Sequence, residues 1–281
     1  MKVRDVLDLI RPVNCAMIGF AVIVGAFVSK PVSVPVLQLA LGFLTGFFLC
    51  AYSMAVNDIY DLEVDRINRP DRAIPSGRVS VKQASRLSLV ALVVGFACSV
   101  LSLNPLAVAV AAAYTFLSWL YSSRAKRTGL AGNLIVASSL AIPFVYGGAV
   151  VGGSIVGSLL LLMAITAFFS GVGREVVKGM ADVPGDAKRN VNSIARSRGL
   201  GFASAVGAFF FLLAVLTSWV PLLTGLANQL YTFGVVVPDV IFLYLAVAIV
   251  ARHEPASAYR VKRIALAGMT VGLLVFVGGA F

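Results

Sequence analysis

Long runs of hydrophobic residues alternate with short polar stretches along the whole chain. A membrane-spanning helix needs about 20 predominantly apolar residues, and several runs approach that length. The pattern therefore predicts an all-α fold, a polytopic membrane bundle of nine transmembrane helices in one integral membrane domain over residues 1–281. The predicted spans are 12–29, 34–56, 82–102, 105–122, 131–151, 153–173, 200–219, 230–250 and 263–280.

The first eleven residues have a different pattern, in which apolar and charged side chains alternate with helical spacing. Val3, Val6, Leu7 and Ile10 would share one face, which suits a short helix at the membrane surface. A cleavable signal peptide is the competing interpretation. The apolar run after Arg11 is too long for one, and acidic residues are atypical of that region, so we expect this end to be retained.

The distribution of charge orients the predicted helices. The chain carries 23 Lys and Arg against 12 Asp and Glu, a net charge of +11. If the nine runs span a membrane, 22 of the 23 basic residues fall on one side and Lys30 stands alone on the other. Basic loops face the cytoplasm, so the N-terminus is expected inside and the C-terminus outside. This loop pattern, in a chain that is 59% hydrophobic, argues against nucleic-acid binding.

All three cysteines lie within apolar runs. Cys15, Cys50 and Cys98 form no CxxC pair. They are expected to be small buried side chains, with neither a disulfide framework nor a zinc site.

Acidic residues are concentrated in two polar segments. Eight of the twelve lie between Asp58 and Asp71 or between Glu175 and Asp186. In the first segment Asn57, Asp61 and Asp65 are four residues apart, so on a helix they share a face with a drift of only ~40° per step. Asp182 and Asp186 repeat that spacing in the second segment. The alternative is two solvated cytoplasmic loops whose charges pair with one another.

The two acidic segments occupy equivalent places in the chain. The first follows the second predicted span, the other follows the sixth, and each precedes a basic stretch containing serine. This arrangement suits two four-helix halves plus a ninth helix. Carboxylate groups that meet across such a bundle favour Mg²⁺, which commonly shares its ligands with substrate phosphates.

Several cationic and polar residues near these segments are candidates for binding a polyphosphate or an acceptor. Tyr at a membrane edge is often only an interfacial anchor, and an arginine there often only snorkels to the headgroups. The candidate substrate-binding residues are Arg11, Asn14, Arg72, Tyr121, Ser122, Arg124, Lys126, Arg174 and Lys178.

Three segments together resemble the UbiA superfamily of intramembrane prenyltransferases. NDIYDLEVDRINRPDRAIPSGRVS at 57–80 is similar to its first signature and REVVKGMADVPGD at 174–186 to its second. YSSRAKRTGLAGN at 121–133 is similar to the segment between them. The chain departs from many relatives at Gly179, where they carry an acidic residue.

The resemblance implies a nine-helix bundle around a central cavity that opens to the cytoplasm and sideways to lipid. It also implies Mg²⁺-dependent transfer of a polyprenyl group from its diphosphate to a lipid-like acceptor. Carried over by position, Asn57, Asp61 and Asp65 would bind one Mg²⁺-diphosphate arrangement and Asp182 with Asp186 the other. The four aspartates are the expected catalytic residues.

RPVNC at 11–15 further resembles the archaeal members that make an ether-lipid precursor. The expected reaction is transfer of a geranylgeranyl group to geranylgeranylglyceryl phosphate. An aromatic acceptor, as in quinone or haem side-chain biosynthesis, is the alternative within the family. A cation transporter is the alternative outside it, and would require ionisable residues on a path across the membrane.

Overall fold

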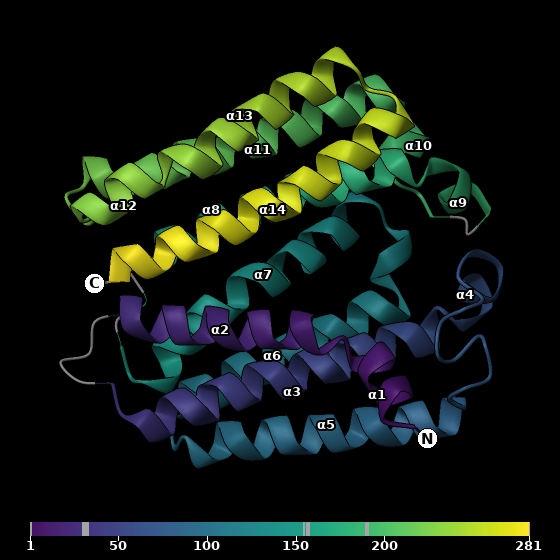
Figure 1. The fold of residues 1–281 in the computed structure, drawn as a ribbon, viewed down its shortest axis with the longest axis horizontal. Coiled ribbons are helices and arrows are strands. Elements are labelled where there is room, and N and C mark those ends of the chain that lie inside the picture. The colour runs from purple at the N-terminus through teal and green to yellow at the C-terminus, as the bar shows by residue number, and fades with distance from the viewer. Residues whose placement is uncertain (1, 30–33, 154, 156–157, 189–190, 281) are drawn as a thin grey trace.

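The computed structural model describes residues 2–29, 34–153, 155, 158–188 and 191–280, and within these ranges every regular element is a helix (Figure 1). Lys30, the single cation expected on the outer side, lies outside them. The helices are α1 (Val3–Ile10), α2 (Pro12–Val28), α3 (Val36–Tyr60), α4 (Leu62–Asn68), α5 (Val81–Leu101), α6 (Pro105–Ser123), the 3₁₀ turn η1 (Ala125–Arg127), α7 (Leu130–Val150), α8 (Leu159–Ala181), α9 (Val183–Lys188), α10 (Ile194–Arg198), α11 (Leu200–Leu223), α12 (Gln229–Gly234), α13 (Val236–Ala251) and α14 (Pro255–Ala280).

The prediction of an all-α membrane bundle is confirmed. In the part of the chain that the structure describes, eight helical segments are long and apolar enough to cross a membrane. The count reaches nine if α1 and α2, which meet at an angle of 52°, form one span. The protein is therefore a multi-pass membrane protein.

Four helices extend at least four residues beyond the spans predicted from hydropathy, and one of them, α11, continues to Leu223 rather than 219. α3 continues to Tyr60 rather than ending at residue 56, α8 continues to Ala181 rather than 173, and α14 already begins at Pro255. Hydropathy marks where the hydrocarbon layer ends, whereas a helix continues for as long as its backbone hydrogen bonds are made. The extensions of α3 and α8 carry the polar segments out of the membrane as helix.

The bend between α1 and α2 is made at Arg11, which has a left-handed backbone with φ of 52°. Its N–H donates to the carbonyl of Leu7 and closes α1, while Pro12 opens α2. The side chain of Leu9 is fully buried in a cluster with Ala55 and other apolar residues. One face of the predicted amphipathic helix thus packs against the bundle.

Figure 1 shows two groups of long helices with α7 between them. α2, α3, α5 and α6 lie on one side, and α8, α11, α13 and α14 lie on the other. α7 packs directly against α2, α6 and α8. The short helices α4, α9 and α10 gather at the end of the bundle where the N-terminus lies, and the C-terminus is at the opposite end.

α2 and α7 approach so closely that only glycine fits between them. A Cβ atom at Gly25 would lie 2.2 Å from the carbonyl oxygen of Phe144, and one at Gly147 would lie 2.1 Å from that of Val22. Small residues permit such backbone contact between membrane helices. This contact joins the first group of helices to α7, which contributes one wall of the cavity described next.

Candidate active site

A cavity of about 720 Å³ lies at the end of the bundle where the polar segments leave the membrane. The ends of α3, α6 and α8 line it together with α4, α7, α9 and η1. Both predicted aspartate pairs contribute to its wall. The sequence-predicted residues that line it are Arg11, Asn57, Asp61, Asp65, Arg72, Tyr121, Ser122, Lys126, Arg174, Lys178, Asp182 and Asp186.

The first polar segment is a helix interrupted at one residue. Asn57 lies in the last turn of α3, Asp61 separates α3 from α4, and Asp65 lies in α4. The backbone N–H of Asp61 donates to the carbonyl of Asn57 at 2.9 Å, and that of Asp65 donates to Asp61 at 2.8 Å. Helical spacing is kept across the break, so the three side chains still face one cavity, although they do not lie on one continuous helix as expected.

The second polar segment repeats this design. Asp182 separates α8 from α9, and Asp186 lies in α9. The N–H of Asp182 donates to the carbonyl of Lys178 at 3.1 Å, and that of Asp186 donates to Asp182 at 2.9 Å. The similarity of the two junctions supports the internal repeat inferred from the sequence.

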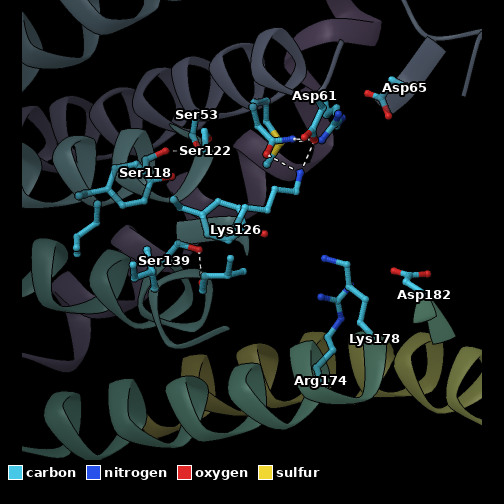
Figure 2. Close-up of a pocket in the computed structure, with 18 of the residues that line it drawn as sticks. Ser53, Asp61, Asp65, Ser118, Ser122, Lys126, Ser139, Arg174, Lys178 and Asp182 are labelled. Carbon is cyan, nitrogen blue, oxygen red and sulfur yellow. Dashed lines mark hydrogen bonds and ion pairs between the residues drawn. The ribbon is translucent and has the colours of Figure 1, made fainter. Parts of the chain in front are cut away.

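Cationic side chains hold the first group of acidic residues. Lys126, which η1 directs into the cavity, forms an ion pair with Asp61, and Asn57 Nδ2 donates to Asp61 Oδ2 at 3.0 Å (Figure 2). Arg72 Nη1 is 2.6 Å from Asp65 Oδ2. These bonds fix the orientation of the oxygens that face the cavity.

Across the cavity, Arg174 and Lys178 extend from α8 toward Lys126 and Asp61 (Figure 2). The neighbouring Asp182 Oδ1 is 3.4 Å from Lys262 Nζ on α14. Lys262 was not among the residues predicted from the sequence. It lies 80 residues from Asp182 in a basic loop-like stretch, and the sequence offers no pattern that connects the two.

The cavity suits a complex of metal and phosphate better than a bare metal ion. No group of three His, Cys, Asp or Glu side chains that could hold a metal by itself occurs among the residues that the structure describes. The donors are carboxylate and amide oxygens, the hard ligands that Mg²⁺ prefers, and Mg²⁺ usually completes its shell with water and phosphate oxygens. The residues present therefore fit Mg²⁺ bound jointly with a polyphosphate.

The charges of the wall also favour an anion. Among the described residues, six cationic and four acidic side chains line the cavity. The formal net charge of these ten side chains is +2. The cationic side chains are Arg11, Arg69, Arg72, Lys126, Arg174 and Lys178.

Two sequence-predicted residues are not brought into the cavity. Asn14 is exposed in the first turn of α2, and Arg124 is exposed at the end of α6. Neither belongs to the lining. At Arg124 the chain leaves α6 and enters η1, and this tight turn directs Lys126 inward and leaves Arg124 outside.

Sequence reasoning missed the deeper wall of the cavity. Ser118 Oγ donates to Ser53 Oγ at 2.6 Å across α6 and α3, and both residues line the cavity. Helical spacing was an available signal, because Ser53 precedes Asn57 by four residues and Ser118 precedes Ser122 by four. The other missed lining residues are Met54, Arg69, Tyr114, Leu117, Ile135, Val136, Ser139, Ile142 and Ala181.

Known proteins share both the sequence pattern and the fold. The model of the UbiA prenyltransferase family matches residues 18–273. A digeranylgeranylglyceryl phosphate synthase of Archaeoglobus fulgidus is 38% identical over 282 residues, which cover 99% of this chain and 96% of that protein.

Two solved structures show the same architecture. A structure described as giving insights into digeranylgeranylglyceryl phosphate synthase in membranes has a TM-score of 0.82 at 28% identity, covering 99% of this chain and 98% of that one. A UbiA homologue from Archaeoglobus fulgidus bound to GPP and Mg²⁺ has a TM-score of 0.70 at 18% identity, covering 97% and 99% of the two chains. This chain therefore belongs to the UbiA prenyltransferase family.

Proposed function

We propose that the protein transfers a geranylgeranyl group from its diphosphate to geranylgeranylglyceryl phosphate. One observation carries the proposal: aspartates from the α3–α4 and α8–α9 junctions line a single cavity with six cationic side chains. Family membership supports prenyl transfer, and the name of the 38% identical relative supports this donor and acceptor. Membership of a prenyltransferase family argues against the alternative that the protein is a cation transporter.

Mg²⁺ is the proposed cofactor. Asn57, Asp61 and Asp65 would hold it on one side of the cavity and Asp182 with Asp186 on the other. Their oxygens suit this ion, and the UbiA homologue that was solved with GPP contains it. Bound there, it would neutralise charge that develops on the departing diphosphate.

The cations of the wall would bind the diphosphate directly. Lys126, Arg174 and Lys178 all face the space between the two aspartate pairs (Figure 2). Fixed positive charges that are aimed at developing negative charge stabilise a transition state without reorganising solvent. Tyr121 and Ser122, which line the same wall, would donate hydrogen bonds to the remaining oxygens.

The deeper part of the cavity would hold the isoprenyl chain. Leu117, Val136 and Ile142 give this region apolar surface beside its serines. Tyr114 and Ile142 also line a small apolar pocket between α2, α3, α6 and α7, which continues the apolar surface. An apolar wall keeps water away from the allylic carbon, where water would otherwise capture the developing cation.

The acceptor would approach from the side of Arg11 and Arg72. Its hydroxyl oxygen forms a bond to the first carbon of the prenyl chain as the bond from that carbon to the diphosphate oxygen breaks. The hydroxyl proton must leave, and Asp65 is a carboxylate of this wall that would accept it. The active-site end of the bundle is proposed to face the cytoplasm, in keeping with its basic loops.

Purified protein in lipid vesicles, supplied with labelled geranylgeranyl diphosphate, Mg²⁺ and a panel of acceptors, would test this function. We expect a labelled ether product from geranylgeranylglyceryl phosphate and none from aromatic acceptors such as hydroxybenzoate. Prenylation of the aromatic acceptors alone would replace the proposed acceptor. Release of label without any product would contradict transfer.

A further inference from the structure

Two buried carboxylates stand behind the cations of the cavity wall. Asp58 on α3 and Glu175 on α8 are each only 5% exposed. Neither lines the central cavity, yet each forms ion pairs with two cationic residues that do. Asp58 faces an outer polar pocket beside α1, and Glu175 faces a smaller pocket beneath η1.

Asp58 joins Arg11 to Arg72. Its Oδ1 is 2.5 Å from Arg11 Nη2 and 3.2 Å from Arg72 Nη1. Arg72 Nη1 also reaches Asp65 Oδ2 at 2.6 Å, and Arg11 is held further by Met54 Sδ at 3.1 Å. Two guanidinium groups from distant parts of the chain are thereby fixed at the same side of the cavity.

Glu175 does the same for Arg174 and Lys178 and uses one oxygen for each. Oε1 is 2.7 Å from Arg174 Nη1, and Oε2 is 2.8 Å from Lys178 Nζ. Long cationic side chains have many rotamers, and a buried carboxylate that pairs with both restricts them to one arrangement. Glu175 thus determines where the two cationic groups lie and not whether they are charged, because they keep their charge without it.

We propose that Asp58 and Glu175 are positioning residues that arrange four of the six cations of the cavity into two anion subsites. Arg174 and Lys178 bind the diphosphate of the prenyl donor, and Arg11 and Arg72 bind the phosphate of the acceptor. The inference rests on the proposed function, since it assigns that function's two phosphate groups to separate walls.

The position of each pair supports the assignment. Arg174, Lys178 and Asp182 are four residues apart along α8, so the α8 pair shares its face with one of the two aspartate groups. That is where a diphosphate held through metal must lie.

Arg11 and Arg72 lie at the boundary between two pockets. Arg11 and Arg72 line both the central cavity and the outer polar pocket of about 890 Å³. A phosphate of the acceptor that is bound between Arg11 and Arg72 would lie at the entrance of the central cavity. The acceptor's hydroxyl, a few bonds from that phosphate, would then reach into the cavity while the phosphate stays outside the donor's site.

The KM values of the Asp58→Asn and Glu175→Gln variants for both substrates test whether the two subsites are separate. Asparagine at position 58 keeps Oδ1 as an acceptor but removes the charge from both of its contacts, whereas glutamine at position 175 replaces one of the two acceptor oxygens with an NH2 group. Each change should raise the affected KM about tenfold. Asp58→Asn should raise KM for geranylgeranylglyceryl phosphate and Glu175→Gln should raise KM for geranylgeranyl diphosphate, with the other KM and kcat within about threefold. Glu63→Gln removes a carboxylate that is 79% exposed and pairs only with Arg66 among the described contacts, so it is the control for charge alone.

A merely structural role predicts a different result. Loss of general stability would raise both KM values together or lower kcat in both variants, and either pattern, or a reversed one, would overturn the proposal. If a neutral variant does not fold, Asp58→Glu and Glu175→Asp keep the charge, move it by one methylene and should give the same crossed pattern.

A binding measurement separates this inference from the proposed function. Geranylgeranyl S-thiolodiphosphate resists cleavage, so its affinity can be measured without turnover. It should bind about tenfold more weakly to Glu175→Gln and equally to wild type and Asp58→Asn. Equal affinity in all three proteins would reject the donor subsite even if wild type makes the expected product. If the analogue binds in the expected pattern but the wild-type protein forms no product from the natural substrates, the proposed function is rejected instead.

Discussion

At the scale of single residues, the first aspartate of each pair marks the end of a long helix. Asp61 follows α3 and Asp182 follows α8, while Asp65 and Asp186 lie in the short helices beyond them. The spacing of four predicted that each pair would face one direction. It did not predict the interruption at Asp61, because no glycine or proline occurs there to signal one.

Asp61→Asn is expected to lower prenyl transfer by about 100-fold or more while the protein stays folded, because a proposed ligand and the partner of Lys126 loses its charge. The measurement is the rate of labelled product formation beside a thermal unfolding curve. Glu63→Gln is the matched control and should retain activity. Full Mg²⁺-dependent turnover by the Asp61 variant would contradict the role assigned to this residue.

Removal of divalent metal should abolish turnover. The aspartates of the wall and the phosphate groups are all negatively charged, so the proposed site needs a metal ion to connect them. Product formation should stop in excess EDTA and return when Mg²⁺ is added in excess. Asp182→Asn should need a higher Mg²⁺ concentration for half-maximal rate than wild type. A rate in EDTA equal to that in Mg²⁺ would exclude the metal from the reaction.

At the scale of helices, hydropathy located the membrane segments but not the surfaces through which they meet. Ser53, Ser118 and Ser139 line the cavity from three different helices, and each lies within a largely apolar run. In most cases the hydroxyl of a serine in such a run donates a hydrogen bond to a backbone carbonyl of its own helix, as that of Ser139 does to the carbonyl of Val136. Identifying the lining therefore required knowledge of which helix faces meet, which is set by packing between distant segments.

Gly147→Ala should destabilise the protein by about 1–3 kcal/mol, because the new methyl group would lie 2.1 Å from the carbonyl oxygen of Val22 and force α2 and α7 apart. Thermal unfolding in detergent, followed by circular dichroism, would measure the loss.

Gly201→Ala in α11 is the matched control, since a Cβ there meets no atom within 4 Å. Alanine is the better helix former, so this variant should be unchanged or more stable by up to about 1 kcal/mol. Equal effects of the two substitutions would show that the contact between α2 and α7 does not contribute to stability.

At the scale of the whole molecule, the two groups of helices and the opposite positions of the termini agree with an odd number of membrane crossings (Figure 1). The basic loops predicted which end faces the cytoplasm. The sequence could not show that α1 folds back onto the bundle through Arg78, whose Nη1 lies 3.0 Å from Asp5 Oδ1 and 2.7 Å from Asp8 Oδ2. These contacts join residues that are 73 and 70 positions apart.

Single cysteines would determine the orientation. The three native cysteines are buried, so an impermeant maleimide should label the wild-type protein weakly. Lys82→Cys and Thr224→Cys place exposed thiols at opposite ends of the bundle. In intact cells Thr224→Cys should react and Lys82→Cys should react only after the membrane is opened. The reverse order would invert the proposed topology.

Burial differs widely among the long helices. Of the segments able to span a membrane, α3 and α8 have the most enclosed apolar windows, at 50% and 56% buried, and α14 has the least, at 22%. The two helices that end in the aspartate junctions are thus shielded by their neighbours, and acyl chains mainly touch the periphery. Changes in bilayer thickness or fluidity should accordingly be absorbed by outer helices such as α14, so that an organism can remodel its lipids with temperature without retuning the chemistry at the centre.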